Sequence, residues 1–188
     1  MSEAVSILKG ASFSGAVEVS DAGLRGMITL RGDLADAAVA GAVKSLTGLA
    51  MPELGQIRSG AKGSVAWMSP DEVLILLDYD KADDAVTKID KALQGKHFMA
   101  VNVSDARALF SLKGAGVREV IAKGAPADLS PAGLPVGTLR RSRLGQVAAA
   151  FWLSDETTMH VICFRSVGGY VYDWLCTAAA PDSLPNVL

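Results

Sequence analysis

Cysteine and histidine are scarce in this chain, with two of each among its 188 residues. Cys163 lies in a segment of strand character and Cys176 in one of helical character, and no second pair of cysteines accompanies them. Neither a disulfide framework nor a zinc site is therefore indicated. We interpret both cysteines as small core residues.

Long apolar runs and a strong net charge are also missing. No run approaches the roughly eighteen apolar residues that a membrane-spanning helix needs, and Met1 to Gly15 lacks a basic start followed by an apolar stretch. We therefore expect a cytoplasmic protein. The net charge of −2 and the pI of about 5.7 give no electrostatic reason to expect nucleic acid or an anionic membrane as a partner.

The sequence contains an internal repeat with an offset of about eighty residues. Its matching pieces are Ile28-Thr29-Leu30-Arg31-Gly32 with Phe110-Ser111-Leu112-Lys113-Gly114, Ala66–Glu72 with Phe151–Glu156, and two helix-spaced apolar stripes, Ala85–Leu93 with Val167–Leu175. Such a period is too long for a solenoid unit, so it indicates two related halves. Half of the composition is apolar, which is enough to fill a sizeable core.

Each half has the pattern strand, helix, hairpin, helix. In the first half we expect a strand at 26–31, followed by a helix that is capped by Asp33 and ends near Gly48, with Leu34, Ala38, Ala42 and Leu46 on one apolar stripe. A loop at 51–63 then leads to a hairpin of 64–68 and 72–77, whose second arm we expect to be central in the sheet. The half ends with a helix from Asp83 to Gly95 and a strand at 97–103. In the second half we expect a strand at 107–113, a helix at 114–123, a proline-containing loop at 124–137, a hairpin of 138–153 and 157–164, and a helix from Val167 to about Ala178 capped by Ser166.

This pattern predicts an α+β fold with mostly antiparallel sheet and helices packed on it. We expect a single domain at 26–180, made of the pseudo-repeats 26–103 and 107–178. It is preceded by an N-terminal arm at 1–25 with little periodicity, either flexible or ordered on a partner, and followed by an irregular tail at 181–188.

Three groups of residues are candidates for chemistry. Gly114-Ala115-Gly116 follows a strand and opens a helix as a dinucleotide-binding turn does, but Glu119 stands where the third glycine should be, which favours a plain start of a helix. His97 and His160 have no acidic, serine or cysteine partner at a recognisable spacing. Asp105 and Arg107 are explained equally well by a turn and a charge at a strand end. We assign no catalytic, cofactor-binding or metal-binding residue.

Arginines and aromatic residues are candidates for an interface. Arg140, Arg141 and Arg143 lie on one strand, where alternation places Arg141 and Arg143 on one face and Arg140 on the other. We favour solvated or interfacial ion pairs over an anion-binding site for these arginines. The matched Trp67 and Trp152 are interpreted as core anchors.

The final helix adds further interface candidates. Tyr172 lies off its apolar stripe, and aromatic residues on outer faces are enriched at protein interfaces. The predicted interface residues are Arg141, Arg143, Arg165, Tyr170 and Tyr172.

The second half carries a family resemblance in a series of short strings. They are Val103-Ser104-Asp105-Ala106-Arg107, Leu112-Lys113-Gly114, Lys123-Gly124-Ala125-Pro126-Ala127-Asp128-Leu129, Leu134-Pro135-Val136-Gly137, Arg143-Leu144, Arg165-Ser166-Val167, Tyr170 and Trp174-Leu175. In this order the strings resemble the gamma subunit of heterotetrameric sarcosine oxidase. The first half fits by its layout and by Leu30-Arg31-Gly32-Asp33.

The resemblance implies a fold related to the folate-binding domain of glycine-cleavage T proteins, which are aminomethyltransferases. It also implies a complex with alpha, beta and delta subunits that demethylates sarcosine with oxygen and tetrahydrofolate to glycine, hydrogen peroxide and methylene-tetrahydrofolate. FAD, FMN and NAD would lie on alpha and beta, zinc on delta, and folate on alpha. The gamma chain would hold no cofactor and no catalytic residue.

We therefore expect a non-catalytic, interaction-type subunit. The alternative is a folate-binding or one-carbon-transfer protein of the aminomethyltransferase type, for which the acidic candidates are Asp33 and Asp105. A self-associating domain is a third interpretation, since a chain made for a complex can form homo-oligomers when it is isolated.

Overall fold

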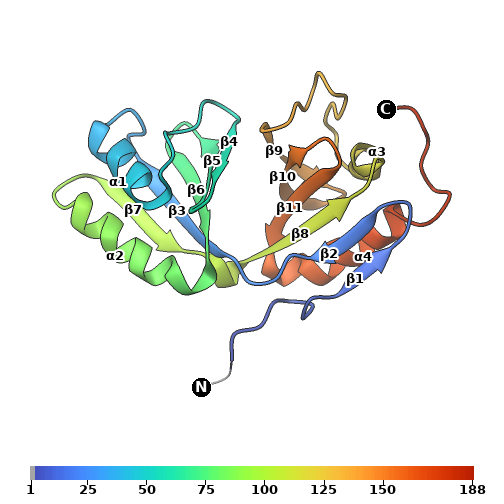
Figure 1. Cartoon of the computed structure of the whole chain (residues 1–188), viewed down its shortest axis with the longest axis horizontal. Coiled ribbons are helices and arrows are strands. Elements are labelled where there is room, and N and C mark those ends of the chain that lie inside the picture. Colours follow the sequence, from blue (N-terminus) through green and yellow to red (C-terminus); the bar gives the residue numbers. More distant parts are fainter. Residues whose placement is uncertain (1–2) are drawn as a thin grey trace. The chain divides into compact units, whose positions relative to one another are not determined.

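The computed structural model describes residues 3–188 and divides into two compact units (Figure 1). One unit comprises Arg25–Asp105. The other combines the segment up to Leu24 with Ala106–Leu188. The two predicted repeats thus fall into different units, and the N-terminal segment belongs with the second repeat.

The unit formed by Arg25–Asp105 is an antiparallel sheet with the strand order β4-β5-β6-β3-β7 and two helices on one face. The strands are β3 (Gly26–Gly32), β4 (Ile57–Gly60), β5 (Gly63–Ser69), β6 (Glu72–Leu77) and β7 (Phe98–Asn102), and the helices are α1 (Ala37–Thr47) and α2 (Ala82–Ala92). All residues of β6 are buried, and β6 pairs with β3 and β5. The prediction of a central second hairpin arm is confirmed.

The start of α1 differs from its prediction. Asp36, not Asp33, caps the helix, because its carboxylate accepts the Ala38 N–H at 2.8 Å and a hydrogen bond from Lys96 Nζ at 2.8 Å. Asp33 forms a turn just before the helix by accepting the Ala35 N–H at 3.0 Å. The buried residues of α1 are Val39, Ala42, Val43 and Thr47. Ala42 of the predicted stripe is thus buried, and the other predicted residues, Leu34, Ala38 and Leu46, are partly buried against the same core. Each aspartate accepts the backbone N–H of the residue two positions further on. The difference is that Asp36 also accepts a hydrogen bond from Lys96, which is distant in sequence.

The predicted loop at 51–63 contains a strand. β4 pairs with β5 over Ile57–Gly60, and β5 begins directly after the turn at Gly63, whose φ of 147° favours glycine. A four-residue edge strand with two polar residues has too little alternation to be seen in the sequence. The end of α1 at Gly48, with φ of 75°, agrees with the prediction.

The other unit is an antiparallel sheet with the strand order β1-β2-β8-β11-β10-β9, on which α3 and α4 pack. The strands are β1 (Ser12–Ser14), β2 (Glu18–Asp21), β8 (Arg107–Lys113), β9 (Leu139–Leu144), β10 (Val147–Asp155) and β11 (Thr158–Phe164), and the helices are α3 (Val117–Ala122) and α4 (Gly168–Ala178). Short 3₁₀ helices are η1 (Tyr79–Lys81), η2 (Ser104–Ala106) and η3 (Arg165–Val167).

Two details of this unit correct the sequence analysis. The predicted strand 138–153 is itself a hairpin, because Gly145 with φ of 60° reverses the chain between β9 and β10. Val167, the last residue of η3, occupies the N-cap position of α4, so the predicted cap Ser166 lies one residue too early.

The N-terminal segment forms two strands that its sequence did not predict. β2 pairs with β8, placing Val19 opposite Leu112. The buried carboxylate of Asp21 then fixes the preceding residues, accepting the Ser6 hydroxyl at 2.6 Å and the N–H groups of Leu8 and Gly10 at 3.1 and 3.2 Å. Burial by itself would raise the pKa of Asp21, but these hydrogen bonds outweigh it and hold the pKa below its usual value.

The two sheets share one topology, which confirms the internal repeat. The order β4-β5-β6-β3 in the first sheet corresponds to β9-β10-β11-β8 in the second. A register irregularity between Trp67 and Ser69 recurs between Leu153 and Asp155, next to the matched Trp152. Each sheet gains a further strand beside its first one: β7 on β3, and β2 on β8. The N-terminal segment thus takes in the second unit the place that β7 takes in the first.

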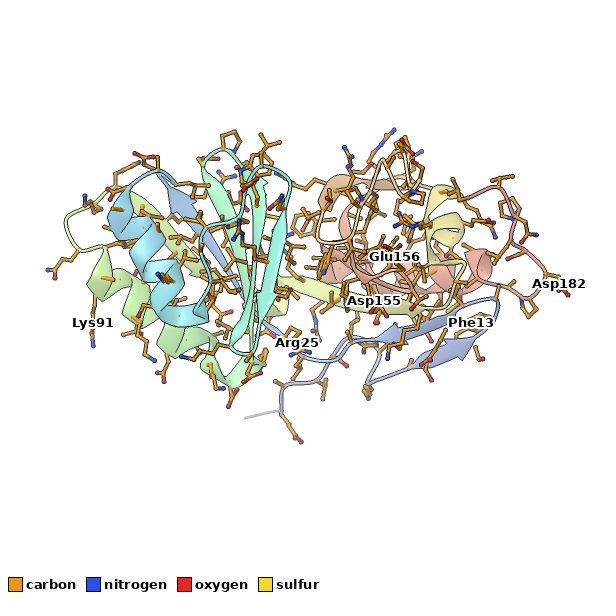
Figure 2. All side chains as sticks on the ribbon, turned by 45° about the horizontal axis from the view of Figure 1, so that its top comes forward. Phe13, Arg25, Lys91, Asp155, Glu156 and Asp182 are labelled. Atoms are coloured by element: carbon orange, nitrogen blue, oxygen red, sulfur yellow. The ribbon has the colours of Figure 1, made fainter. Side chains whose placement is uncertain are left out.

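The proline-containing loop at 124–137 is held by a buried arginine. Arg118 Nη1 donates to the carbonyl oxygens of Leu129 and Leu134 at 2.9 and 2.8 Å, and its Nη2 lies 3.3 Å from Glu156 Oε2. Figure 2 labels Glu156, which lies next to Asp155 in the β10–β11 turn. Several carbonyl groups that lack partners in regular structure are satisfied by this single side chain. The loop therefore closes over the core beside α3.

Candidate functional site

The strand β9 presents its arginines on two faces of the sheet, as alternation predicts. Arg141 lies opposite Ala150 and Arg143 opposite Ala148, whereas Arg140 lies opposite Phe151, a core residue. Arg141 and Arg143 therefore point away from the helix-covered face. Both are exposed.

Two further residues join these arginines on the same face. Arg107 of β8 pairs with Phe164 of β11, and Arg107 Cζ lies 5.1 Å from the centre of the Phe164 ring. The adjacent row of the sheet runs through Ile162 and Ala150 to Arg141. We call Arg107, Arg141, Arg143 and Phe164 the arginine patch. Phe164 is not among the predicted interface residues, because its partner Arg107 is distant in sequence.

Phe164 gives the patch an apolar centre. Half of its surface (50%) is exposed, although it is a large aromatic residue at the end of a central strand. An arginine over an aromatic ring is an attractive arrangement that also holds the guanidinium in place. The patch thus combines fixed positive charge with exposed apolar area, a composition typical of interfaces.

The other predicted interface residues lie in different settings. Arg165 Nη2 donates to the Val5 carbonyl at 2.8 Å, so it holds the N-terminal segment. Tyr170 is 51% exposed, and its hydroxyl lies next to Gly145 in the β9–β10 turn. Tyr172 does not lie on an outer face as expected: its ring packs 6.0 Å from that of Phe110, and burial, with a hydrogen bond to Cys176, raises its pKa.

Of the residues considered for catalysis, His160 and Asp105 have structural partners. His160 stacks on Trp152 with ring centres 5.1 Å apart, and its Nε2 lies 3.2 Å from Ser154 Oγ. His97 is exposed just before β7. Asp105 accepts the Tyr79 hydroxyl at 3.0 Å. Burial raises the pKa of the Cys163 thiol to about 11, which keeps it protonated at neutral pH.

The turn at Gly114-Ala115-Gly116 faces the chain's own tail. Leu184 lies against Gly116, in the space that a Cβ at this position would need. Glu119, the residue in place of the third glycine, accepts N–H groups of the tail. In residues 3–188, no group of three or more histidine, cysteine or acidic side chains is placed to hold a metal ion. No helix of the same range is long and apolar enough to cross a membrane.

Solved structures with the same fold come from sarcosine metabolism and from glycine cleavage. Heterotetrameric sarcosine oxidase from Corynebacterium sp. U-96, in complex with pyrrole 2-carboxylate, matches with a TM-score of 0.80 and 22% identity over 89% of this chain and 87% of that chain. Glycine cleavage system aminomethyltransferase T from Bartonella henselae matches with a TM-score of 0.62 and 13% identity over 84% of this chain. This chain spans 45% of the aminomethyltransferase. The predicted relation to the aminomethyltransferase fold is confirmed.

Sequence comparison gives the family. No curated protein sequence matches the chain significantly. The model of the sarcosine oxidase gamma subunit family matches residues 31–181, which is most of the chain and spans both repeats. The order of short strings noted in the sequence lies largely within this range. The chain belongs to the sarcosine oxidase gamma subunit family.

Proposed function

We propose that this chain is the gamma subunit of a heterotetrameric sarcosine oxidase and serves it as a non-catalytic docking subunit. Its partners are the alpha, beta and delta subunits of a cytoplasmic complex. The complex oxidatively demethylates sarcosine to glycine with tetrahydrofolate and oxygen, giving methylene-tetrahydrofolate and hydrogen peroxide. FAD, FMN, NAD, tetrahydrofolate and zinc belong to the other subunits. The family match and the likeness to a heterotetrameric sarcosine oxidase support this proposal.

The arginine patch is the observation that carries the docking role. Guanidinium groups bind carboxylates in a planar, two-pronged geometry that fixes orientation. Arg141 and Arg143 are exposed in a chain of net charge −2, so the patch concentrates positive charge in a slightly acidic protein. We infer that it docks on a partner face that combines carboxylates with an apolar contact for Phe164. Arg165, Tyr170 and Tyr172 lie outside the patch and are proposed as further interface residues.

The acidic candidates for folate chemistry have other roles in this structure. Asp33 forms the turn before α1, and Asp105 accepts the Tyr79 hydroxyl. The contact of Asp33 positions the backbone, and that of Asp105 positions the Tyr79 side chain. They support a docking role over one-carbon transfer by this chain.

A charge reversal on β9 tests the docking role with a built-in control. Arg143→Glu places a carboxylate in the patch, whereas Arg140→Glu makes the same change on the opposite face of the same strand. We expect Arg143→Glu to weaken assembly with the other subunits about tenfold at low salt, and less at high salt, because exposed charge pairs act mainly through screened Coulomb attraction. The measurement is the yield of co-purified, flavin-containing complex and its turnover of sarcosine.

The outcome that contradicts the proposal is normal assembly and normal turnover in the absence of this chain. If Arg143→Glu and Arg140→Glu lowered the yield of assembled complex equally, the arginine patch would not be the docking surface. Calorimetric titration of the purified chain with tetrahydrofolate distinguishes the alternative, since micromolar binding would assign folate to this chain.

A further inference from the structure

The tail after α4 has a defined conformation although it lacks regular structure. Asp182 and Asn186 both adopt left-handed backbone with φ of 57°. The left-handed conformation costs free energy in residues other than glycine, although aspartate and asparagine tolerate it better than most. It persists where the surrounding contacts fix the backbone. Two left-handed residues within so short a segment indicate that specific contacts fix its path.

Glu119 supplies the central contact. Its carboxylate accepts the backbone N–H groups of three successive tail residues: Asn186 at 2.7 Å, Val187 at 3.0 Å and Leu188 at 3.2 Å. Glu119 is 5% exposed, so its charge lies almost wholly out of solvent. A buried carboxylate needs strong hydrogen bonds, and N–H donors to a charged acceptor are among the strongest.

Two neighbours on the same side of α3 complete the contact surface. Gly116, which precedes α3, lacks a Cβ and so leaves room for the Leu184 side chain, which packs partly into the core. Lys123, which follows α3, donates from Nζ to the Ala178 carbonyl at 2.6 Å and to Ser183 Oγ at 2.9 Å. One extended segment thus makes three kinds of contact with this side of α3. Its leucine side chain lies at Gly116, three of its backbone amides donate to Glu119, and its serine hydroxyl accepts from Lys123.

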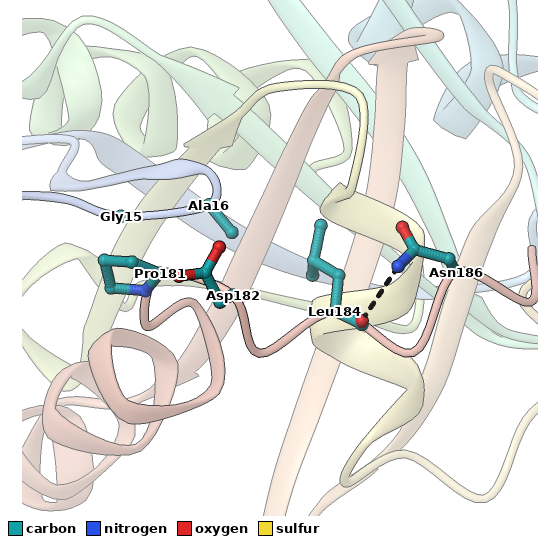
Figure 3. Close-up of a pocket in the computed structure, with 6 residues that line it drawn as sticks. All are labelled: Gly15, Ala16, Pro181, Asp182, Leu184 and Asn186. Carbon is teal, nitrogen blue, oxygen red and sulfur yellow. Dashed lines mark hydrogen bonds between the residues drawn. The ribbon is translucent and has the colours of Figure 1, made fainter.

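The tail is attached at separate points rather than sealed against the unit. A hollow of about 550 Å³ lies beside it, lined by Gly15, Ala16, Pro181, Asp182, Leu184 and Asn186 (Figure 3). The side chain of Val187 is 75% exposed, and that of Leu188 is 51% exposed. Polar contacts to backbone and one leucine hold the segment, and contacts of this kind do not require a covalent connection to the unit.

We propose that Gly116, Glu119 and Lys123 form a peptide-binding site. Its ligand is an extended, uncharged segment of the type Ser183–Leu188. In this structure the chain's own tail occupies the site, from which it can be displaced. The N–H groups that converge on Glu119 are the recognition element, and the leucine fills the slot at Gly116. This proposal is independent of the docking role of the arginine patch, which lies on other residues. It also explains why a dinucleotide-like turn carries glutamate in place of its third glycine.

The test uses the full chain with its own tail displaced. Asn186→Pro removes one of the three N–H donors and forbids the left-handed backbone at this position, so we expect it to loosen the tail from the site without shortening the chain. Acetylated Ser-Leu-Pro-Asn-Val-Leu, the sequence of residues 183–188, is then titrated in trans and followed by calorimetry. We expect saturable binding to Asn186→Pro, at least about tenfold weaker binding to the unmodified chain, and at least about tenfold weaker binding when Glu119→Gln is added, since a charged acceptor is lost.

A control variant separates specific recognition from non-specific peptide binding. Glu18→Gln makes the same chemical change on the exposed face of β2 and is expected to leave peptide binding unchanged. A folded Asn186→Pro chain that does not bind the peptide overturns the proposal, as does binding that Glu119→Gln leaves intact. If Asn186→Pro does not fold, hydrogen exchange of the full chain decides: Glu119→Gln must speed exchange at residues 186–188 at least tenfold relative to Glu18→Gln, and unchanged exchange refutes the site.

Discussion

Replacing Phe164 by alanine removes the apolar centre of the arginine patch. A phenylalanine side chain can bury roughly 200 Å². Since Phe164 is 50% exposed in the free chain, about 100 Å² of it remains to be covered by a partner. At about 25 cal/mol per Å², this area is worth about 2.5 kcal/mol, or roughly 70-fold in the dissociation constant. The contact between the Phe164 ring and Arg107 already exists in the free chain and so is not counted as a gain on binding.

The dissociation constant for the remaining subunits is the quantity to measure, for example by biolayer interferometry with the immobilised chain. Because the other half of Phe164 packs within its own unit, the variant is compared well below its melting temperature. Leu54→Ala is the matched control, since Leu54 is an 80% exposed aliphatic residue outside the patch. A change below threefold for Phe164→Ala, or an equal change for Leu54→Ala, would refute the assignment of this surface.

Two predictions concern the stability of the unit that bears the patch. Asp21→Asn should lower the free energy of unfolding by about 2–4 kcal/mol at pH 7, because charge-assisted hydrogen bonds to the N-terminal segment are lost. The folded pKa of Asp21 is depressed, so the difference from the unmodified chain should persist above about pH 4 and shrink as acid protonates the carboxylate; urea titrations at several pH values measure it. Gly124→Ala should destabilise by about 1–3 kcal/mol because its Cβ meets the Trp174 ring, and thermal melts of the double variant with Trp174→Ala should show smaller damage than the two single changes add up to.

Local patterns in the sequence were sufficient for the repeated order of strand, helix, hairpin and helix, and for the duplication, although they missed β1, β2, β4 and the break between β9 and β10. Alternation placed Arg141 and Arg143 on one face and Arg140 on the other, because side chains along a strand alternate whatever the strand pairs with. The continuous apolar run of β6 indicated a central strand, because it gives both faces of the strand apolar side chains. The resemblance to the gamma subunit family also depended on sequence alone, through the order of short strings in the second half.

Features that depend on long-range pairing could not be predicted in this way. β2 is a short segment with weak periodicity, and it becomes a strand because the free edge of β8 supplies its hydrogen bonds. Asp36 and Asp33 are equivalent as caps in the sequence, and the hydrogen bond that Lys96 donates goes to Asp36. The break between β9 and β10 depends on how a single glycine turns.

The α+β class, the two repeats and the family follow from hydrophobic periodicity and motif order, which are local properties of the sequence. What the surface residues do depends instead on contacts made in the folded chain. The tertiary structure placed Phe164 beside Arg107, turned Tyr172 inward onto Phe110, and set Glu119 against the amides of the tail. Each of these contacts joins residues far apart along the chain, and the sheet register and the packing of helices on it bring them together.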